Sequence, residues 1–296
     1  MKQTMDSVGA KVEHRRLATG IRIGYVSRGE GPLVILLHGF PDTYHGFLPI
    51  LEPLAAAGYR AVAPAMRGYA GSDLATDGDY RIEALAADVV GLADALGAER
   101  FSIVGHDWGA VAAYAASNLA AERIDRLITA AVPHTGHFLM SMASRQLIRS
   151  RYMLRFQIPG LPEWEIPRHD FAWLEDLIRS WSPGWHFGAA EMQPLKACFS
   201  EPGRLRAALS YYRQIPRSLL SPLSRRLVFS PVTTPTRMLY GRNDGCIGPE
   251  VFQHQERRFT RGLDLQAIAD AGHFMQWEQP DTFARQTIEF LDAGRR

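Results

Sequence analysis

Uninterrupted apolar stretches that alternate with helical patterns constrain the fold of this chain more than any other feature. Four such stretches cover residues 33–37, 60–63, 101–104 and 126–132. Strands that are apolar along their whole length are typical of a parallel sheet covered by helices on both faces, because neither face meets water. The sequence therefore predicts an α/β fold with a mostly parallel central sheet.

The two ends of the chain complete this pattern. Residues 12–17 and 21–27 are short, strand-like and joined by a turn, so they predict an antiparallel hairpin before the parallel strands. Strand patterns resume at 236–240 and 263–268, and a last helix is expected at about 281–291.

A helical insertion interrupts the predicted sheet between about residues 134 and 228. Its composition shifts to Arg, Trp, Tyr, Phe and Pro, and apolar residues recur at helical spacing, as in Leu205, Ala208, Leu209 and Tyr212. We therefore expect one core, made of residues 1–133 and 229–296, with residues 134–228 as an inserted helical cap.

The charge balance makes a small molecule the expected partner. The chain has 33 Lys and Arg against 31 Asp and Glu, without the dense basic block that nucleic-acid or membrane binding favours. No apolar run approaches the roughly 20 residues that span a bilayer. The opening residues 1–6 lack the apolar centre of a secretory signal, so we expect a cytoplasmic protein.

The cysteines and histidines do not form a metal-binding pattern. Cys198 and Cys246 are expected to be free thiols, although the sequence alone leaves a disulfide open. Zinc-ligand spacing, a phosphate loop and a dinucleotide fingerprint are all missing. We predict a reaction without metal or cofactor.

Asp107 is the best candidate for a nucleophile. It stands in Gly105-His106-Asp107-Trp108-Gly109, between an apolar strand and a helix rich in small residues. Small residues on both sides suit a sharp strand-to-helix turn that exposes its central side chain. A carboxylate there attacks without a base and leaves an ester. An Asp near a helix N-terminus is also favoured by the helix dipole alone, so this motif needs support.

The support comes from residues after the later strands. Asp244 follows the strand at 236–240, and His273 follows the strand at 263–268, which gives the chain order nucleophile, acid, histidine. The sequence Asn243-Asp244-Gly245 is also favoured in turns on its own account. After the first parallel strand, His38-Gly39-Phe40-Pro41 suits an oxyanion hole formed by the N–H groups of Phe40 and Trp108.

With these residues, the chain resembles the epoxide hydrolases of the α/β-hydrolase fold along nearly its whole length. The matching segments are HGFP at 38–41, RGYAGSD at 67–73, GHDWG at 105–109, GRNDGC at 241–246 and AGHF at 271–274. The resemblance implies that the core residues 1–133 and 229–296 form an α/β-hydrolase core.

The resemblance also implies two cap tyrosines that hydrogen-bond the epoxide oxygen. They match Tyr152, in the segment 152–160, and Tyr212, which precedes Arg213 and lies on the apolar helical face. Tyrosines at helical spacing are more often packing residues, yet an alkoxide leaving group needs a donor. Within the matching segments we expect substrate contacts from four residues, which are His38, Pro41, Phe156 and Gln157.

The implied reaction converts an epoxide and water to a vicinal diol. Asp107 attacks the epoxide, and water activated by His273 and Asp244 hydrolyses the ester. A haloalkane dehalogenase with the same nucleophile is the nearest alternative, and its second halide donor would have to come from a cap tryptophan, of which there are four, Trp164, Trp173, Trp181 and Trp185.

Other readings fit the residues less well. Fluoroacetate dehalogenases place Arg after the nucleophile, where this chain has Trp108, and a serine esterase needs a Ser elbow. A catalytically silent member of the fold that binds a small ligand is a further alternative. The apolar cap leaves a homodimer open.

Overall fold

The computed structural model describes residues 4–5, 11–142 and 145–294. The opening segment, from which we expect no secretory signal, lies mostly outside these ranges. Within them, no helix is both long and apolar enough to cross a membrane.

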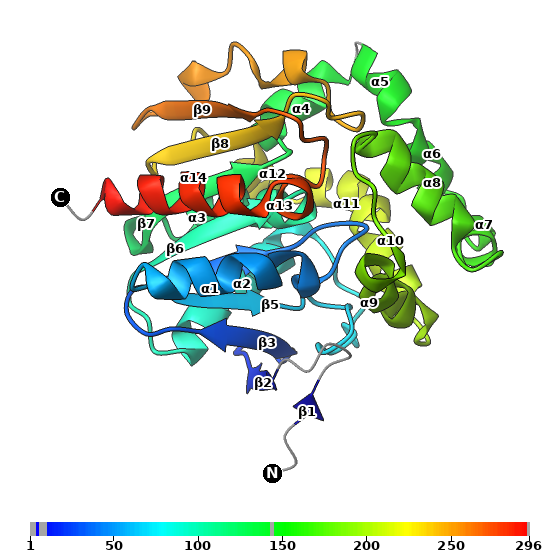
Figure 1. The fold of residues 1–296 in the computed structure, drawn as a ribbon, viewed down its shortest axis with the longest axis horizontal. Coiled ribbons are helices and arrows are strands. Elements are labelled where there is room, and N and C mark those ends of the chain that lie inside the picture. The colour runs from blue at the N-terminus through cyan, green and yellow to red at the C-terminus, as the bar shows by residue number, and fades with distance from the viewer. Residues whose placement is uncertain (1–3, 6–10, 143–144, 295–296) are drawn as a thin grey trace.

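One sheet of nine strands forms the centre of the described chain, in the order β1-β2-β3-β5-β4-β6-β7-β8-β9 (Figure 1). The six strands from β5 to β9 in this order are parallel, and β2 and β3 form the predicted antiparallel hairpin. The strands are β1 (Thr4–Met5), β2 (Lys11–Arg16), β3 (Arg22–Arg28), β4 (Leu33–Leu37), β5 (Arg60–Pro64), β6 (Phe101–His106), β7 (Ile124–Ala130), β8 (Thr236–Gly241) and β9 (Leu263–Ile268).

The predicted α/β fold with a mostly parallel sheet is confirmed. All five residues of β4 and all six of β6 are buried, as the apolar sequence of β4 and the mostly apolar sequence of β6 indicate. Because the carboxyl ends of parallel strands lie at one edge of the sheet, the residues that follow β4, β6, β8 and β9 converge there.

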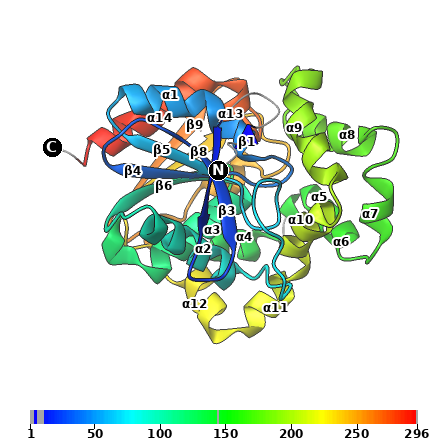
Figure 2. The ribbon, with the colours of Figure 1, turned by 90° about the horizontal axis from the view of Figure 1, so that it is seen from below.

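Helices cover both faces of the sheet (Figure 2). One face carries α1 (Leu48–Ala56), α13 (Met275–Glu278) and α14 (Pro280–Asp292), and the other carries α2 (Ile82–Ala95), α3 (Trp108–Leu119) and α12 (Pro222–Phe229). In the described part of the chain, four short 3-10 helices lie in the connections, at η1 (Tyr44–Phe47), η2 (Ala121–Arg123), η3 (Pro249–Phe252) and η4 (Glu256–Arg258).

The segment between β7 and β8 is helical. Its helices are α4 (Thr135–Ser141), α5 (Arg145–Arg149), α6 (Arg151–Phe156), α7 (Leu161–Glu165), α8 (Ala172–Trp181), α9 (Ala189–Ser200), α10 (Arg204–Arg213), α11 (Ile215–Leu220) and α12. Helices α5 to α10 stand beside the sheet, at the right of Figure 1, while α12 packs on α2 and α3. The segment thus places α6, α8 and α10 over the edge where the candidate residues converge.

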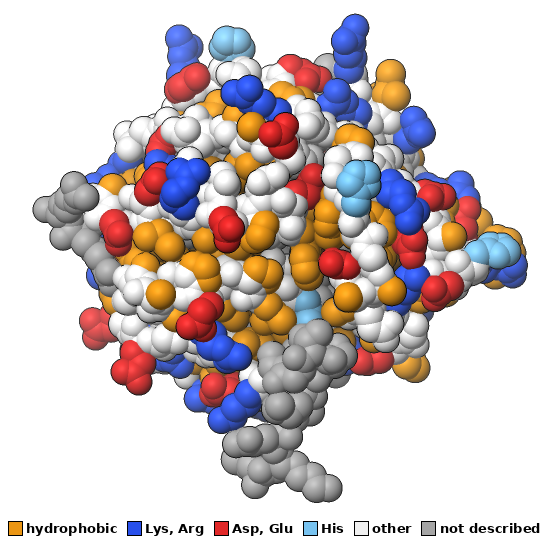
Figure 3. Space-filling model, viewed as in Figure 1, with side chains coloured by type: hydrophobic (Ala, Val, Ile, Leu, Met, Phe, Trp, Pro, Cys, Tyr) orange, Lys and Arg blue, Asp and Glu red, His pale blue; other side chains and the backbone are white. Residues whose placement is uncertain are grey.

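Charges of both signs are mixed on the surface. On the face drawn in Figure 3, Lys and Arg side chains lie among Asp and Glu. Several pair within one helix, such as Arg179 with Glu175 and Asp176 in α8. Neither sign gathers into a patch on this face.

Candidate active site

Asp107 lies at the turn between β6 and α3. Its φ of 51° is a left-handed backbone conformation that L-residues rarely adopt. The turn is so tight that a Cβ on Gly105 would overlap the Gly109 carbonyl, and a Cβ on Gly109 would overlap the Leu37 carbonyl. Both glycines are therefore required by the turn that presents Asp107 at the edge of the sheet.

The loop after β4 holds the Asp107 carboxylate from one side. The Phe40 N–H donates to Asp107 Oδ1 over 2.7 Å. Gly39 lies so close that a Cβ there would overlap Asp107 Cβ and Oδ1. Trp108 begins α3, where its N–H has no partner within the helix, and it makes no hydrogen bond to the carboxylate in the described residues. The role of Trp108 in an oxyanion hole stays a prediction.

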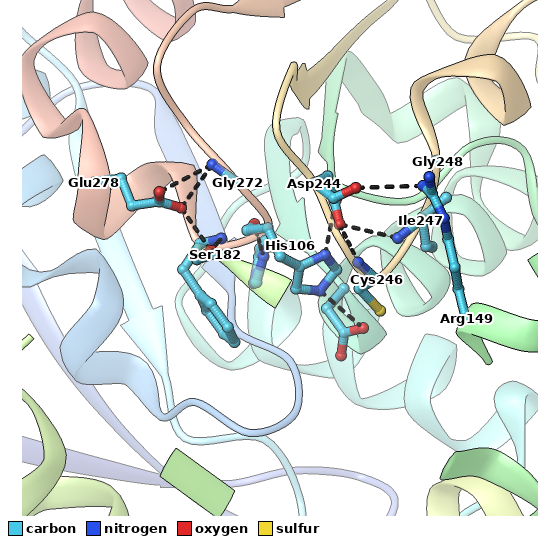
Figure 4. A network of polar contacts seen from close by, with 12 residues as sticks. His106, Arg149, Ser182, Asp244, Cys246, Ile247, Gly248, Gly272 and Glu278 are labelled. Carbon is cyan, nitrogen blue, oxygen red and sulfur yellow. Dashed lines mark hydrogen bonds and ion pairs between the residues drawn. The ribbon is translucent and has the colours of Figure 1, made fainter. Parts of the chain in front are cut away.

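Asp244 and His273 meet Asp107 from the ends of β8 and β9. His273 Nδ1 lies 2.9 Å from Asp244 Oδ2, and His273 Nε2 lies 3.6 Å from Asp107 Oδ2. All three side chains are buried. Asp244 Oδ1 accepts the N–H groups of Cys246 at 2.7 Å and Ile247 at 2.9 Å (Figure 4). The His273 imidazole therefore lies between the carboxylates of Asp107 and Asp244, and the Asp244 carboxylate is held by N–H groups of its own loop.

These carboxylates control the charge of His273. Burial lowers the pKa of the imidazole, but the charges and hydrogen bonds of Asp244 and Asp107 outweigh burial and raise that pKa to about 10. The ring is therefore an imidazolium at neutral pH. Because Asp107 contributes to the shift, a reaction that neutralises Asp107 lowers the pKa of His273 and prepares the ring to accept a proton.

Two cap tyrosines line the same cavity as Asp107. Tyr152, from α6, places its Oη 3.7 Å from Cys246 Sγ. Tyr212, from α10, forms no hydrogen bond of acceptable geometry through its Oη with the described residues, although the side chains of Trp108 and Tyr152 approach it. Burial raises the pKa of both phenols, so both are protonated donors at neutral pH. A buried hydroxyl without a partner is rare in folded proteins and calls for an explanation, such as a catalytic role or a bound water.

The neighbouring Tyr211 points away from the cavity. Its hydroxyl donates to the Arg67 carbonyl over 2.8 Å. Successive residues of a helix point in directions about 100° apart, so Tyr211 and Tyr212 cannot face the same side of α10. The helical phase in the sequence correctly separates these two residues.

The rest of the cavity lining is apolar. Apart from Trp108, whose indole carries an N–H, Thr135 is the one further polar side chain among the described lining residues, and its hydroxyl donates to the Val228 carbonyl over 2.9 Å. The other lining residues are Ile82, Trp108, Val111, Val132, Phe138, Leu139, Met153, Ile215, Leu219, Val228 and Ile247. A ligand in the cavity therefore meets one carboxylate and two phenols in apolar surroundings. The aliphatic lining residues could not be identified from the sequence, because helical periodicity indicates burial but not what a buried side chain faces.

Two of the expected substrate contacts, His38 and Pro41, lie outside the described cavity lining. His38 Nε2 accepts the Met66 N–H over 3.0 Å, and its Nδ1 lies 3.1 Å from the Gly39 carbonyl. Burial lowers the pKa of His38 to about 4, so the ring is neutral. With both ring nitrogens occupied by backbone, His38 joins the loops after β4 and β5 instead of facing a ligand.

The other two expected contacts, Phe156 and Gln157, also lie outside the described lining. Phe156 is buried behind the rings of Tyr152 and Tyr212, with centroid separations of 5.4 and 5.1 Å. Gln157 is exposed and donates to the carbonyls of Met153 and Tyr212, both over 3.2 Å. Both residues therefore support the helices that carry the tyrosines.

Comparison with known proteins places the chain in a family. The profile of the alpha/beta hydrolase fold family matches residues 32–280. The chain is 31% identical to human epoxide hydrolase 4, with 98% of this chain and 81% of that protein covered. It is 30% identical to epoxide hydrolase A of Mycobacterium tuberculosis, with 96% and 98% covered. The crystal structure of Bacillus megaterium epoxide hydrolase with an inhibitor aligns with a TM-score of 0.83 at 25% identity, over 95% of this chain and 100% of that one.

Proposed function

Because the chain belongs to the epoxide hydrolases of the α/β-hydrolase superfamily, we propose that it converts an epoxide and water to a vicinal diol through a covalent ester on Asp107. The observation that carries this proposal is the Tyr212 hydroxyl, which lacks a hydrogen-bond partner in the described chain and faces the cavity that also contains Asp107. A donor without a protein acceptor beside a buried carboxylate suits a substrate whose oxygen takes up charge.

In the first step, an Asp107 oxygen attacks an epoxide carbon, and the bond from that carbon to the epoxide oxygen breaks. Tyr152 and Tyr212 donate hydrogen bonds to this oxygen as it becomes an alkoxide. Such general acid assistance contributes a factor of about 10² to 10⁴ to a rate. The Phe40 N–H, already bonded to Asp107 Oδ1, holds the carboxylate while its other oxygen reacts.

The ester changes the electrostatics of His273. Esterification removes the negative charge of Asp107, so one of the two carboxylates that hold the pKa of His273 high is lost. The imidazolium then gives up a proton, which neutralises the alkoxide through the phenols, and the ring becomes a base. Asp244 remains bonded to Nδ1 and keeps Nε2 directed at the ester.

In the second step, neutral His273 takes a proton from water, and the resulting hydroxide attacks the ester carbonyl of Asp107. The Phe40 N–H stabilises the oxyanion, and Trp108 N–H is the second donor that we propose. Collapse of this intermediate breaks the ester bond, and the proton on the Asp107 carboxyl neutralises the departing diol. Asp107 and the imidazolium are thereby restored.

A haloalkane dehalogenase is favoured less by this site. Its halide would need a second N–H donor besides Trp108, and the four cap tryptophans are the candidates for that role. None of them is among the described lining residues, and Trp164 is 58% exposed at the surface. Two phenols occupy the facing positions instead. The silent ligand-binding alternative is disfavoured by the assembled Asp107, His273 and Asp244, whose charges would serve no purpose in binding an apolar ligand.

Turnover and trapping together test this function. The protein is incubated with styrene oxide, a haloalkane and a p-nitrophenyl ester in parallel, and diol, chloride and nitrophenol are measured. We expect diol. In His273→Gln the ester should form but persist, so intact mass should show an adduct of one epoxide, and Asp107→Ala should show neither adduct nor diol. Chloride release without diol would instead assign a dehalogenase, and absence of all products and adducts would refute the proposed chemistry.

A further inference from the structure

Two consecutive cap residues at the end of α8 contact the loops that carry the acid and the histidine. The Trp181 carbonyl accepts the Gly245 N–H at 3.0 Å and the His273 N–H at 3.2 Å. Ser182 Oγ accepts the Phe274 N–H at 3.1 Å. Three backbone donors from two separate core loops therefore converge on one end of a cap helix.

Glu278, in α13, completes this network from the core side. Ser182 Oγ donates to Glu278 Oε1 over 2.7 Å, and both Glu278 oxygens accept the Gly272 N–H at 2.9 Å (Figure 4). The three successive N–H groups of Gly272, His273 and Phe274 are thus all fixed, by Glu278, by the Trp181 carbonyl and by Ser182. The backbone on both sides of the catalytic histidine depends on these contacts.

The packing around the network is close. A Cβ on Gly272 would lie 2.5 Å from Ser182 Cα, and a Cβ on Gly245 would overlap the Ser180 carbonyl. The Trp181 ring lies edge-on against the His273 ring, with centroids 5.1 Å apart. The cap and both catalytic loops are therefore in direct backbone contact, and a shift of the end of α8 would move His273.

The other parts of the site are carried by different elements, although the Tyr152 ring also packs against the Trp181 ring, with centroids 4.9 Å apart. Asp107 is positioned by the β6–α3 turn and by the Phe40 N–H. Tyr152 and Tyr212, the proposed donors to the epoxide oxygen, belong to α6 and α10. No hydrogen bond of the described chain joins these residues to Ser182 or Glu278. Attack on the epoxide uses Asp107 and the tyrosines, whereas only hydrolysis of the ester uses His273 as a base.

We infer that Ser182 and Glu278 are positioning residues that tie the cap to His273 and are required for hydrolysis of the ester but not for its formation. This inference rests on the proposed two-step function. It assigns the cap a role in both halves of the reaction, through the tyrosines in the first half and through the end of α8 in the second.

The test separates the two steps in Ser182→Ala and Glu278→Ala. Single-turnover experiments with styrene oxide follow the ester by rapid acid quench and intact mass, and give its rates of formation and decay. We expect decay to slow about ten-fold, because small misplacement of a catalytic group has effects of this size or larger, while formation changes less than about two-fold. In the steady state kcat should fall and kcat/KM should stay near the wild-type value, since kcat/KM reports ester formation.

Matched variants separate positioning from general damage. Ser180→Ala removes a hydroxyl from the same helix that donates only to the Leu177 carbonyl, so both rates should remain unchanged. Glu278→Gln keeps an acceptor for the Gly272 N–H and should recover most of the decay rate that Glu278→Ala loses. If Glu278→Ala does not fold, Ser182→Ala still decides the matter.

Equal losses in formation and decay, or a decay rate that neither substitution changes, would overturn the inference. Both results differ from failure of the proposed function itself, because that failure appears in the wild type as absence of diol and in His273→Gln as absence of an adduct.

Discussion

Replacing Tyr212 with phenylalanine should slow the reaction and at the same time stabilise the fold. The Tyr212 hydroxyl is buried and makes no hydrogen bond of acceptable geometry in the described chain, whereas its ring packs between Phe40, Trp108 and Phe156. The ring packing is retained in phenylalanine. Removing a buried hydroxyl that lacks a partner relieves a desolvation cost of about 1 to 3 kcal/mol. We expect the free energy of unfolding to rise by only about 1 kcal/mol, because weak contacts with the Trp108 and Tyr152 side chains already offset part of this cost.

The effect on chemistry should have the opposite sign. If Tyr212 donates to the epoxide oxygen, its loss should slow ester formation by about 10² to 10⁴. The rate is best measured in a His273→Gln background, where the ester accumulates and its appearance reports the first step alone. The free energy of unfolding is measured by urea titration of the single variant.

Tyr211→Phe is the matched control, because it removes the same atom from the adjacent residue. The Tyr211 hydroxyl donates to the Arg67 carbonyl, so its removal leaves that buried acceptor without its partner and should destabilise the protein by about 1 kcal/mol. Ester formation should be unaffected. The reasoning is refuted if Tyr212→Phe, in the His273→Gln background, forms the ester within two-fold of the rate of His273→Gln alone. It is also refuted if Tyr212→Phe destabilises the protein as Tyr211→Phe does.

Two further perturbations test the surroundings of the site. Gly39→Ala should lower kcat/KM at least about 100-fold, because its Cβ would overlap the Asp107 side chain and displace the nucleophile. Gly184→Ala is the control and should leave kcat/KM unchanged, because a Cβ there meets nothing within 4 Å. Equal kcat/KM values for the two variants would contradict the close approach of Gly39 to Asp107. Burial raises the pKa of Asp42 to about 7, above its ordinary 3.8, so the folded protein keeps a proton that the unfolded chain loses, and the stability contributed by this group falls as pH rises from about 4 to 7. Urea titrations should therefore show Asp42→Asn gaining stability relative to the wild type between pH 5 and pH 8, by a few kcal/mol at most, and a pH-independent difference would exclude this explanation.

Much of the sheet could be predicted because strands buried on both faces have nearly continuous apolar sequences. The strand at 33–37, which is buried along its whole length, was predicted with its observed bounds. The bounds of the strand at 263–268 were also predicted, although five of its six residues are only half-buried. The strand predicted at 126–132 is instead β7, Ile124–Ala130. Ala131 has a φ of 62°, and Val132 is buried in the loop, so apolar sequence continued past the end of the strand.

The polar contacts of the site could be predicted only where they follow from position along a strand or helix. Asp107, Asp244 and His273 follow parallel strands, and the shared edge of the sheet brings them together. His38 also follows a strand, but its ring turns to the Met66 N–H, which depends on the neighbouring loop. Position along the chain predicts which loop a residue occupies, not which side of the loop its side chain takes.

The contacts of Ser182 and Glu278 show the same limit. These residues are 96 positions apart, and the hydrogen bond between them depends on how the cap sits on the core. Neither residue belongs to a motif segment that resembles the epoxide hydrolases. Glu278, as a charged residue of a short helix, would be expected at the surface. Burial of its carboxylate against the Gly272 N–H becomes visible only in the folded chain.

The source of the oxygen in the diol tests the central claim most directly. A single turnover is run in water enriched in oxygen-18, with the enzyme in excess over styrene oxide. If Asp107 forms the ester and water attacks its carbonyl, the new diol oxygen comes from Asp107. The first diol should then be unlabelled, and the label should appear in the peptide that contains Asp107. Label in the first diol, with none in that peptide, would show direct attack by water and contradict a covalent ester on Asp107.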